Sequence, residues 1–323
     1  MFDVSIVAPL YNEEATFPHL IQRLNTLMDS LDLRIEIVLI DDGSRDNTPL
    51  LMNELALSDN RYNAVFLSRN YGHQVALTAG FSAARGSQAV MVIDGDLQDP
   101  PELLSLFYSR LQQGYDIAYA VRQKRTEGWL KRTAYFLFYR FLGSISSIKI
   151  PLDSGDFAML SRRTVDVLNA MPEESRYLRG MRSWIGFRQI GIPYERDERV
   201  AGEAKYSFKM LWRLAYNGIF NFSDYPIKFI TRLGVGTSSL AITYLIYNVI
   251  RKFVYGDVPQ GFTATIFLIT LFSGVQLVAL GIIGEYVLRI FFQVKGRPLF
   301  LVRDQIKDCE LTHTAILKPT QTA

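Results

Sequence analysis

Residues 88–100 read QAVMVIDGDLQDP, and this stretch gives the first indication of an α/β fold. Its first half, residues 88–93, is a short run with no charged side chain. Such runs are typical of a strand that is buried on both faces of a parallel sheet. Asp94 and Asp96 follow directly, so we expect both carboxylates at the end of a strand, where open α/β sheets bind their ligands.

The sequence on both sides of this stretch alternates between strand and helix patterns. The expected strands are 4–10, 35–40, 64–67, 88–93 and 117–120, and the expected helices are 13–30, 46–57, 74–84 and 101–112. This alternation predicts an α/β fold with a mostly parallel, doubly wound sheet. Motifs that follow its strands should therefore gather at one edge of the sheet.

Two further strands also end in acidic motifs. Residues 9–14 read PLYNEE, and residues 41–44 read DDGS. None of the three loops carries a glycine-rich phosphate-binding fingerprint. Carboxylates repel phosphates, so a nucleotide bound here requires a divalent cation between them. Asp94, Asp96 and the amide of Gln98 offer the oxygen ligands that Mg²⁺ or Mn²⁺ prefers.

Two long uncharged segments follow residue 232. They are residues 233–250, with 18 residues, and residues 258–284, with 27 residues. A helix of about 20 apolar residues spans a bilayer. We therefore predict a hairpin of two transmembrane helices at about 231–251 and 263–287, with two buried helices of a soluble domain as the alternative. Small residues that allow close helix packing in lipid are Gly234, Gly236, Gly274, Gly281 and Gly284.

Basic residues predict the orientation of this hairpin. Those at its outer ends are Lys228, Arg232, Arg289, Lys295, Arg297 and Arg303, whereas only Arg251 and Lys252 flank the connection. The positive-inside rule then places both termini in the cytoplasm, and the first residues lack a signal-peptide pattern. We expect a multi-pass protein of the inner (cytoplasmic) membrane. Residues 1–228 would then form a cytoplasmic domain that carries the acidic motifs, and 293–323 a cytoplasmic tail that we expect to be mobile from Asp304 onward.

The bulk composition narrows the function classes. The chain has 323 residues, which suits one α/β domain and a membrane segment, and its formal net charge is +3. So small a charge does not indicate nucleic-acid binding. The single cysteine, Cys309, excludes a disulfide framework and a zinc site built from several cysteines.

Four motifs occur in the order that a known protein family shows. They are PLYNEE at 9–14, DDGSRDNT at 41–48, RNYG at 69–72 and DGDLQDPP at 94–101. With them the chain resembles the family-two glycosyltransferases of GT-A fold. It is more similar to their polyisoprenyl-phosphate branch, which includes undecaprenyl-phosphate glucosyltransferases, dolichol-phosphate mannose synthases and aminoarabinose transferases. The resemblance runs from residue 4 to about 303 and includes the two-helix anchor.

The resemblance implies an inverting transfer of a sugar from a nucleotide sugar to a polyisoprenyl phosphate at the cytoplasmic membrane face. Within the branch, the anchor favours glucose from UDP-glucose and undecaprenyl phosphate as acceptor. Aminoarabinose, an N-acetylhexosamine, and mannose from GDP-mannose are the alternative sugars for the same reaction. It also implies Mg²⁺ or Mn²⁺ as cofactor, a homo-oligomer such as a tetramer, and a downstream flippase in a pathway that modifies lipopolysaccharide or another cell-surface glycan.

The resemblance also assigns roles to residues. The donor nucleotide would contact Pro9, Tyr11, Glu13, Asp41, Asp42, Arg69, Arg199 and Lys205. Asp94 and Asp96 would be catalytic metal ligands, with Gln98 as a further ligand. Asp156 would be catalytic by orienting the acceptor or the sugar, because a phosphate monoester is largely dianionic at neutral pH and needs no strong base. His73 would shape the donor pocket.

Basic and aromatic residues mix at about 128–148 and 205–222, which predicts interfacial helices on the membrane. Core helices with a solvated basic face are the alternative. Candidates for the acceptor phosphate are Arg122, Arg125, Lys131 and Arg132.

Two other functions agree less well with the motifs of this sequence. A processive polysaccharide synthase of this fold usually carries a Gln-x-x-Arg-Trp motif, and Arg182-Ser183-Trp184 lacks the upstream glutamine. A noncatalytic scaffold would be expected to lose the acidic ligands, which are intact here.

Overall fold

The computed structural model describes residues 2–122, 154–195, 225–255 and 261–313. The chain divides into two units. The first contains residues 1–139, 148–208 and 298–323, and the second contains 140–147 and 209–297. The predicted interfacial helices lie outside the described residues, as do five predicted site residues: Arg125, Lys131, Arg132, Arg199 and Lys205.

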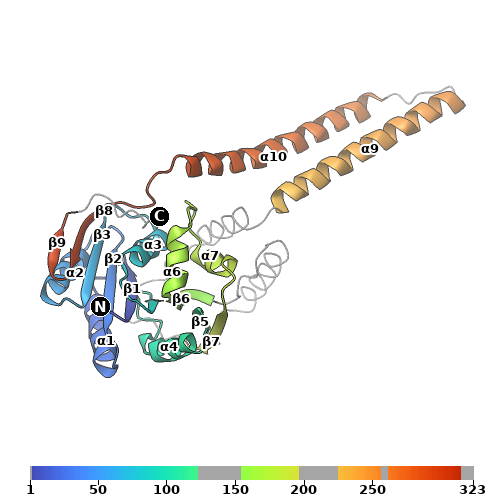
Figure 1. The fold of residues 1–323 in the computed structure, drawn as a ribbon. Helices are drawn as coiled ribbons and strands as arrows, with labels where there is room; N and C mark the ends of the chain where they lie inside the picture. The colour runs from blue at the N-terminus through green and yellow to red at the C-terminus, as the bar shows by residue number, and fades with distance from the viewer. Residues whose placement is uncertain (1, 123–153, 196–224, 256–260, 314–323) are drawn as a thin grey trace. The chain divides into compact units, whose positions relative to one another are not determined.

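The described part of the first unit is built on a nine-stranded sheet (Figure 1). Its strands are β1 (Val4–Leu10), β2 (Ile35–Asp41), β3 (Tyr62–Leu67), β4 (Ala89–Val92), β5 (Ile117–Arg122), β6 (Ser154–Ser161), β7 (Gln189–Tyr194), β8 (Val302–Lys307) and β9 (Glu310–Thr312). They lie in the order β7-β5-β6-β4-β1-β2-β3-β8-β9.

The four strands at the centre of the sheet, β4, β1, β2 and β3, are parallel, as are β5 and β7. Two antiparallel strands interrupt this pattern: β6 pairs with both β4 and β5, and β8 pairs with β3. The predicted α/β fold is therefore confirmed, as a mixed sheet with a parallel centre.

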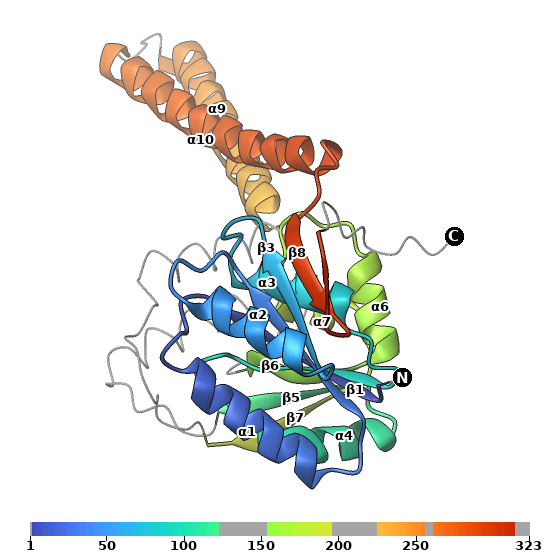
Figure 2. The ribbon, with the colours of Figure 1, turned by 90° about the vertical axis from the view of Figure 1, so that its left-hand side faces the viewer.

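Helices cover both faces of the sheet and make three layers (Figure 2). On one face lie α1 (Phe17–Ser30), α2 (Thr48–Ser58), the short 3-10 helix η1 (Pro101–Leu103) and α4 (Leu104–Gln112); on the other lie α3 (His73–Ala83), α6 (Arg162–Ala170) and α7 (Leu178–Trp184). Because both faces are covered, every residue of β1, β2 and β3 is buried. Pro18 and Pro49 stand in the first turns of α1 and α2, where a missing N–H costs nothing.

The predicted mobile tail is wrong for residues 304–312, since β8 and β9 extend the sheet beyond β3. The physical reason is that two apolar side chains of β8 are buried. Val302 and Ile306 point into the core, with 2% and 0% exposure. Asp308 and Cys309 have φ of 53° and 61°, the left-handed pair that a tight two-residue hairpin turn requires.

Arg85 joins this hairpin to the centre of the sheet. The carboxylate of Glu36 in β2 is fully buried and accepts hydrogen bonds from Ser5 Oγ at 2.6 Å and Arg85 Nε at 2.7 Å. Arg85 Nη1 also donates to Asp308 at 2.8 Å. One guanidinium thus compensates the buried charge of Glu36 and holds the hairpin turn.

The second unit consists, in its described residues, of two long helices that lie side by side, α9 (Tyr225–Tyr255) and α10 (Phe262–Val294) (Figures 1 and 2). Residues 225–254 and 267–294 have mean hydropathies of 1.4 and 2.1. Their apolar side chains are exposed, for example Leu245 at 62% and Leu277 at 69%. Exposed apolar surface of this extent is unfavourable in water, so both helices are candidate membrane spans.

The glycines of these helices do not mediate the contact between α9 and α10, and their packing against other helices in lipid stays a prediction. A Cβ added at Gly234, Gly236, Gly274, Gly281 or Gly284 would meet nothing within 4 Å. These positions therefore leave open surface, and they do not bring α9 and α10 into close contact.

Arg85→Ala should lower the free energy of unfolding by about 3–5 kcal/mol, because it leaves the buried carboxylate of Glu36 without its cationic partner. Asp308→Asn removes only the exposed side of the same network and should cost less than about 1 kcal/mol. Denaturation of both variants in detergent, followed by tryptophan fluorescence, compares the two values. Equal losses would contradict the assignment of Glu36 as the dominant partner.

Candidate functional site

The three acidic loops meet at one edge of the sheet, as the strand pattern predicts. β1 lies between β2 and β4, with Leu10 opposite Asp41 and Val7 opposite Val92. The residues that follow these strands therefore emerge next to one another.

Hydrogen bonds join the first two loops directly. The side-chain oxygen of Asn12 accepts from the Arg45 N–H at 2.8 Å, and the Asn12 N–H donates to Ser44 Oγ at 3.0 Å. Glu14 accepts from Asn47 Nδ2 at 2.7 Å. These contacts explain why α1 begins at Phe17 and not at residue 13: the residues before it are used to fix the loops.

The aspartate pair after β2 holds the neighbouring loops. Asp42 is buried, and its two carboxylate oxygens accept the N–H groups of Tyr71 at 2.7 Å and Gly72 at 2.9 Å. Burial raises the pKa of Asp42. Asp41 accepts the Ser44 N–H at 3.0 Å and so supports the loop, while its predicted contact with the donor nucleotide stays a prediction. The predicted contact of Asp42 with a nucleotide base stays a prediction.

Gly43 allows the loop after β2 to lie against the loop after β3. It has φ of 71°, and a Cβ there would lie 2.6 Å from Arg69 C and from Asn70 N. Only glycine fits such a position. The exposed Arg69 guanidinium lies over the ring of Tyr71, 4.7 Å from its centroid.

The loop after β4 carries the predicted metal ligands in a tightly constrained conformation. A Cβ at Gly95 would lie 2.6 Å from Leu10 Cδ2, so this residue packs directly on the end of β1. Leu97 has φ of 60°, which is unusual for a residue with a branched side chain. Asp96 accepts the Gln98 N–H at 3.2 Å.

The pairing of β4 with β6 brings Asp156 to the same place. Val92 lies opposite Ala158 in this antiparallel pair, so continuing by two residues on each strand leads to Asp94 and Asp156. His73, the first residue of α3, contacts both: its Nε2 lies 3.4 Å from Asp156 Oδ2 and 3.7 Å from Asp94 Oδ1.

Asp156 is held by two residues that sequence reasoning missed, Arg179 and Gln74. Its side chain is 8% exposed and accepts from Arg179 Nε at 3.0 Å and from Gln74 Nε2 at 2.9 Å. Gln74 could have been found, because it follows the loop motif at 69–72. Arg179 lies in α7, outside every recognised motif, and only the folded chain brings it here.

These charges shift three pKa values. Burial alone would raise the pKa of Asp156, but Arg179 and His73 outweigh it and hold that pKa far below the usual range. Burial also opposes the charging of His73, yet Asp156 and Asp94 raise its pKa to about 9. For Asp94, burial and the nearby Asp99, Asp96 and Asp156 raise the pKa to about 6. The site thus concentrates negative charge around Asp94.

The residues present fit a divalent cation that arrives with a phosphate ligand. The carboxylates of Asp94 and Asp96 belong to one loop. A cation would stabilise the charged form of Asp94, whose pKa is raised first by burial and then by the neighbouring carboxylates. Within the described residues, no group of three or more His, Cys, Asp or Glu side chains is arranged to hold a metal alone. Phosphate oxygens of a ligand would have to complete the coordination.

The roles of the remaining described site residues, donor contacts for Pro9, Tyr11 and Glu13 and an acceptor-phosphate contact for Arg122, stay predictions. Pro9 lies in β1 opposite Ile40, and Tyr11 and Glu13 follow in the loop, both partly buried. Arg122 ends β5, next to Tyr194 of β7 in the register.

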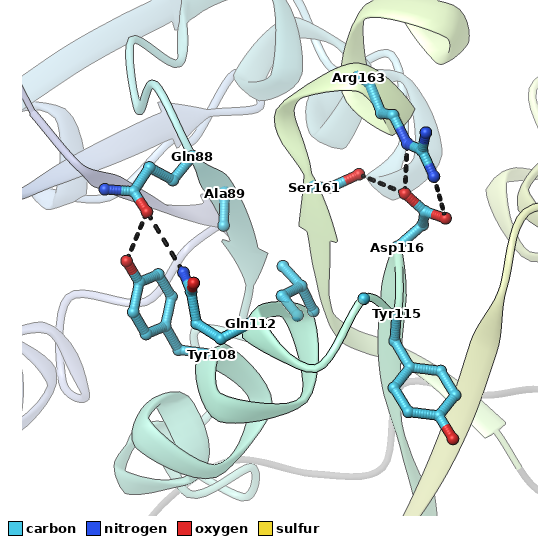
Figure 3. Close-up of a pocket in the computed structure, with 10 residues that line it drawn as sticks. Gln88, Ala89, Tyr108, Gln112, Tyr115, Asp116, Ser161 and Arg163 are labelled. Carbon is cyan, nitrogen blue, oxygen red and sulfur yellow. Dashed lines mark hydrogen bonds and ion pairs between the residues drawn. The ribbon is translucent and has the colours of Figure 1, made fainter.

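A separate hollow of about 330 Å³ lies at the opposite edge of the sheet (Figure 3). Gln88 and Tyr108 line one side, and Asp116 with Arg163 line the other. These polar groups bind one another: Tyr108 donates to Gln88 at 2.6 Å, and Arg163 pairs with Asp116. None of the predicted site residues lines this hollow, so the acidic edge is the candidate site.

Residues 5–168 match the profile described as glycosyl transferase family 2. The chain is 40% identical over 304 residues to an uncharacterized glycosyltransferase of Synechocystis, covering 94% of this chain and 95% of that protein. It is 36% identical over 301 residues to the bactoprenol glucosyl transferase of Shigella phage SfII, covering 93% and 97%. Identity to the prophage bactoprenol glucosyl transferase homolog of Escherichia coli K12 is 34% over 301 residues, covering 93% and 98%.

Two solved structures are similar at lower identity. The mannosyltransferase of Pyrobaculum calidifontis, in complex with GDP-Man and Mn²⁺, is 19% identical, with a TM-score of 0.47 and coverage of 67% of this chain and 61% of that one. Glucosyl-3-phosphoglycerate synthase of Mycobacterium tuberculosis, in complex with Mn²⁺, UDP and glucosyl-3-phosphoglycerate, is 18% identical, with a TM-score of 0.41 and coverage of 68% and 77%.

Gly43→Ala should release the loop at residues 69–72. The left-handed conformation costs an alanine about 1–2 kcal/mol, and the new Cβ also clashes with the backbone of Arg69 and Asn70. Amide hydrogen exchange at Tyr71, whose N–H donates to Asp42, should become about tenfold faster or more. Gly114→Ala is the control, since Gly114 has φ of 87° but its added Cβ would meet only Arg188 Nη1 at 3.5 Å. Unchanged exchange at Tyr71 in Gly43→Ala would contradict this account.

Proposed function

Because the chain belongs to glycosyl transferase family 2, with the GT-A fold that its sequence predicted, we propose that it transfers a sugar from a nucleotide sugar to a polyisoprenyl phosphate. Bactoprenol is a polyisoprenyl alcohol, and relatives at 34–36% identity over most of the chain are named bactoprenol glucosyl transferases. These names favour glucose, from UDP-glucose, as the sugar and undecaprenyl phosphate as the acceptor. Other sugars remain alternatives within the same reaction.

The observation that carries the proposal is the acidic edge, where Asp94, followed in the same loop by Asp96, lies opposite an Asp156 that is paired with Arg179. A divalent cation, Mg²⁺ or Mn²⁺, held by Asp94, Asp96 and Gln98 would neutralise charge on the departing nucleotide diphosphate. The loops after β1 and β2, with Tyr11 and Asp42, would bind the nucleoside.

Asp156 acts in this proposal as a positioning group. A carboxylate whose pKa lies far below the usual range is a poor proton acceptor at neutral pH. The acceptor phosphate is itself largely dianionic and needs no base. Asp156, fixed by Arg179 and Gln74, therefore orients the sugar or the acceptor so that the attack occurs on the face opposite the leaving group, with inversion.

The two apolar helices support a location in the membrane, where the lipid acceptor resides. We propose that both termini are cytoplasmic, because the basic residues gather at the outer ends of the hairpin. A homo-oligomer and a flippase that acts on the product belong to the same proposal.

The full-length protein in detergent, given undecaprenyl phosphate, Mg²⁺ or Mn²⁺ and radiolabelled UDP-glucose, should pass label into the organic phase. Addition of EDTA should abolish the transfer, because the diphosphate would then face the acidic edge without a cation. A parallel panel of UDP- and GDP-sugars identifies the donor. Absence of lipid-linked label with every donor, from folded protein, would refute the proposal.

Asp156→Asn should lower kcat at least about 100-fold while the KM for the nucleotide sugar changes little, because the donor is held by other loops. Asp166→Asn is the matched control, since Asp166 also pairs with an arginine, Arg162 at 2.6 Å, but lies on the surface. Steady-state kinetics of both variants make the comparison. Full turnover by Asp156→Asn would exclude a positioning role for Asp156.

A further inference from the structure

We propose that a buried hydrogen bond between Tyr194 and Asp99 positions the loop of residues 94–99 for cation binding. Tyr194 would thereby be a positioning residue, although it is 95 residues distant from Asp99 in the sequence. The inference rests on the proposed function, in which Asp94 and Asp96 are cation ligands.

The loop needs such restraints because its conformation is strained. Leu97 has φ of 60°, a region that residues with branched side chains rarely adopt unless the surroundings impose it. Arg23 Nη1 donates to the Leu97 carbonyl at 3.4 Å, and Glu102 fixes this guanidinium through two bonds of 2.7 and 2.8 Å. The packing of Gly95 on Leu10 restrains the start of the loop.

Asp99 restrains the end of the loop. Its side chain is almost fully buried, at 2% exposure, and its Oδ1 accepts from the Tyr194 hydroxyl at 2.5 Å. Bonds of this length between a hydroxyl and a carboxylate belong to the strong, charge-assisted class. Loss of the hydroxyl would leave one oxygen of a buried carboxylate without this donor, and the loop could then relax away from its strained conformation.

Aromatic packing fixes the ring of Tyr194 and so the position of its hydroxyl. The ring of Tyr194 lies edge-on to Phe157 at 5.6 Å between centroids, and Phe157 packs on Phe107 at 5.2 Å. Phe157 directly follows Asp156 in β6. The same strand therefore places Asp156 beside Asp94 and supports the tyrosine that holds the far end of the cation loop.

Tyr194 is also the last residue of β7. The chain continues from it to Arg199 and Lys205, both predicted to contact the donor phosphates. The Tyr194–Asp99 bond thus joins the cation loop to the strand from which that segment departs.

Tyr194→Phe tests the proposal, because it removes the hydroxyl and keeps the ring. Binding of Mn²⁺ to the full-length protein in detergent, in the presence of UDP, is measured by electron paramagnetic resonance. We expect the dissociation constant for Mn²⁺ to rise about tenfold, as the loss of one charge-assisted hydrogen bond implies. Tyr108→Phe is the matched control: its hydroxyl donates to Gln88 at 2.6 Å at the opposite edge of the sheet, and Mn²⁺ binding should not change.

Asp99→Asn provides the conservative test from the other side of the bond. Asparagine keeps an oxygen that accepts from Tyr194, so Mn²⁺ binding should weaken less than in Tyr194→Phe. Melting temperatures of all variants are recorded alongside. If Tyr194→Phe lowers the melting temperature but binds Mn²⁺ as tightly as the unchanged protein, the bond only stabilises the core and the inference is wrong. If the unchanged protein binds no Mn²⁺ with UDP, the cation part of the proposed function fails, and the inference fails with it.

Discussion

Repulsion between carboxylates at one edge of the sheet is the constraint on which the rest of the site depends. Asp94, Asp96, Asp99 and Asp156 all lie at or near the end of β4, and burial makes their mutual repulsion stronger than it would be in water. Each of the other groups described reduces this cost in a different way. Arg179 and His73 compensate Asp156, His73 also lies 3.7 Å from Asp94, and the Tyr194 hydroxyl donates to Asp99. In the proposed function, a cation bound together with a diphosphate would compensate the carboxylates of Asp94 and Asp96.

A second constraint is the close approach of the loops. Gly43 and Gly95 stand where a Cβ would overlap a neighbouring loop or strand, and Asp42 accepts two backbone N–H groups across the gap. Several residues of the four quoted motifs therefore bind other loops of the protein. Asn12 and Glu14 are examples, since their side chains accept hydrogen bonds from the loop after β2. A motif of this kind preserves the shape of a pocket as well as its chemistry.

The sequence allowed the parallel centre of the sheet, the acidic edge and both apolar helices to be predicted, because each depends on a local pattern. Strand order could not be predicted in full: β6 enters the sheet in the opposite direction, and that reversal alone places Asp156 beside Asp94. Arg179 and Tyr194 escaped notice because long-range packing, and no motif, brings them to the site. The strand at 302–307 was missed because its alternation is short and mostly polar on the outward side.

Because β8 follows the two apolar helices in the sequence, its position limits where the chain can be truncated. The chain leaves the first unit, passes through α9 and α10, and then returns to contribute β8 and β9 to the sheet. In the sequence, the apolar helices are thus an insertion within the first unit and not a C-terminal extension of it. A chain shortened before residue 225 would lose the strand that covers β3, and the freed edge would offer unpaired backbone groups to other molecules. To make a water-soluble form, one would instead delete the two helices and join the chain before residue 225 to residues 298–313.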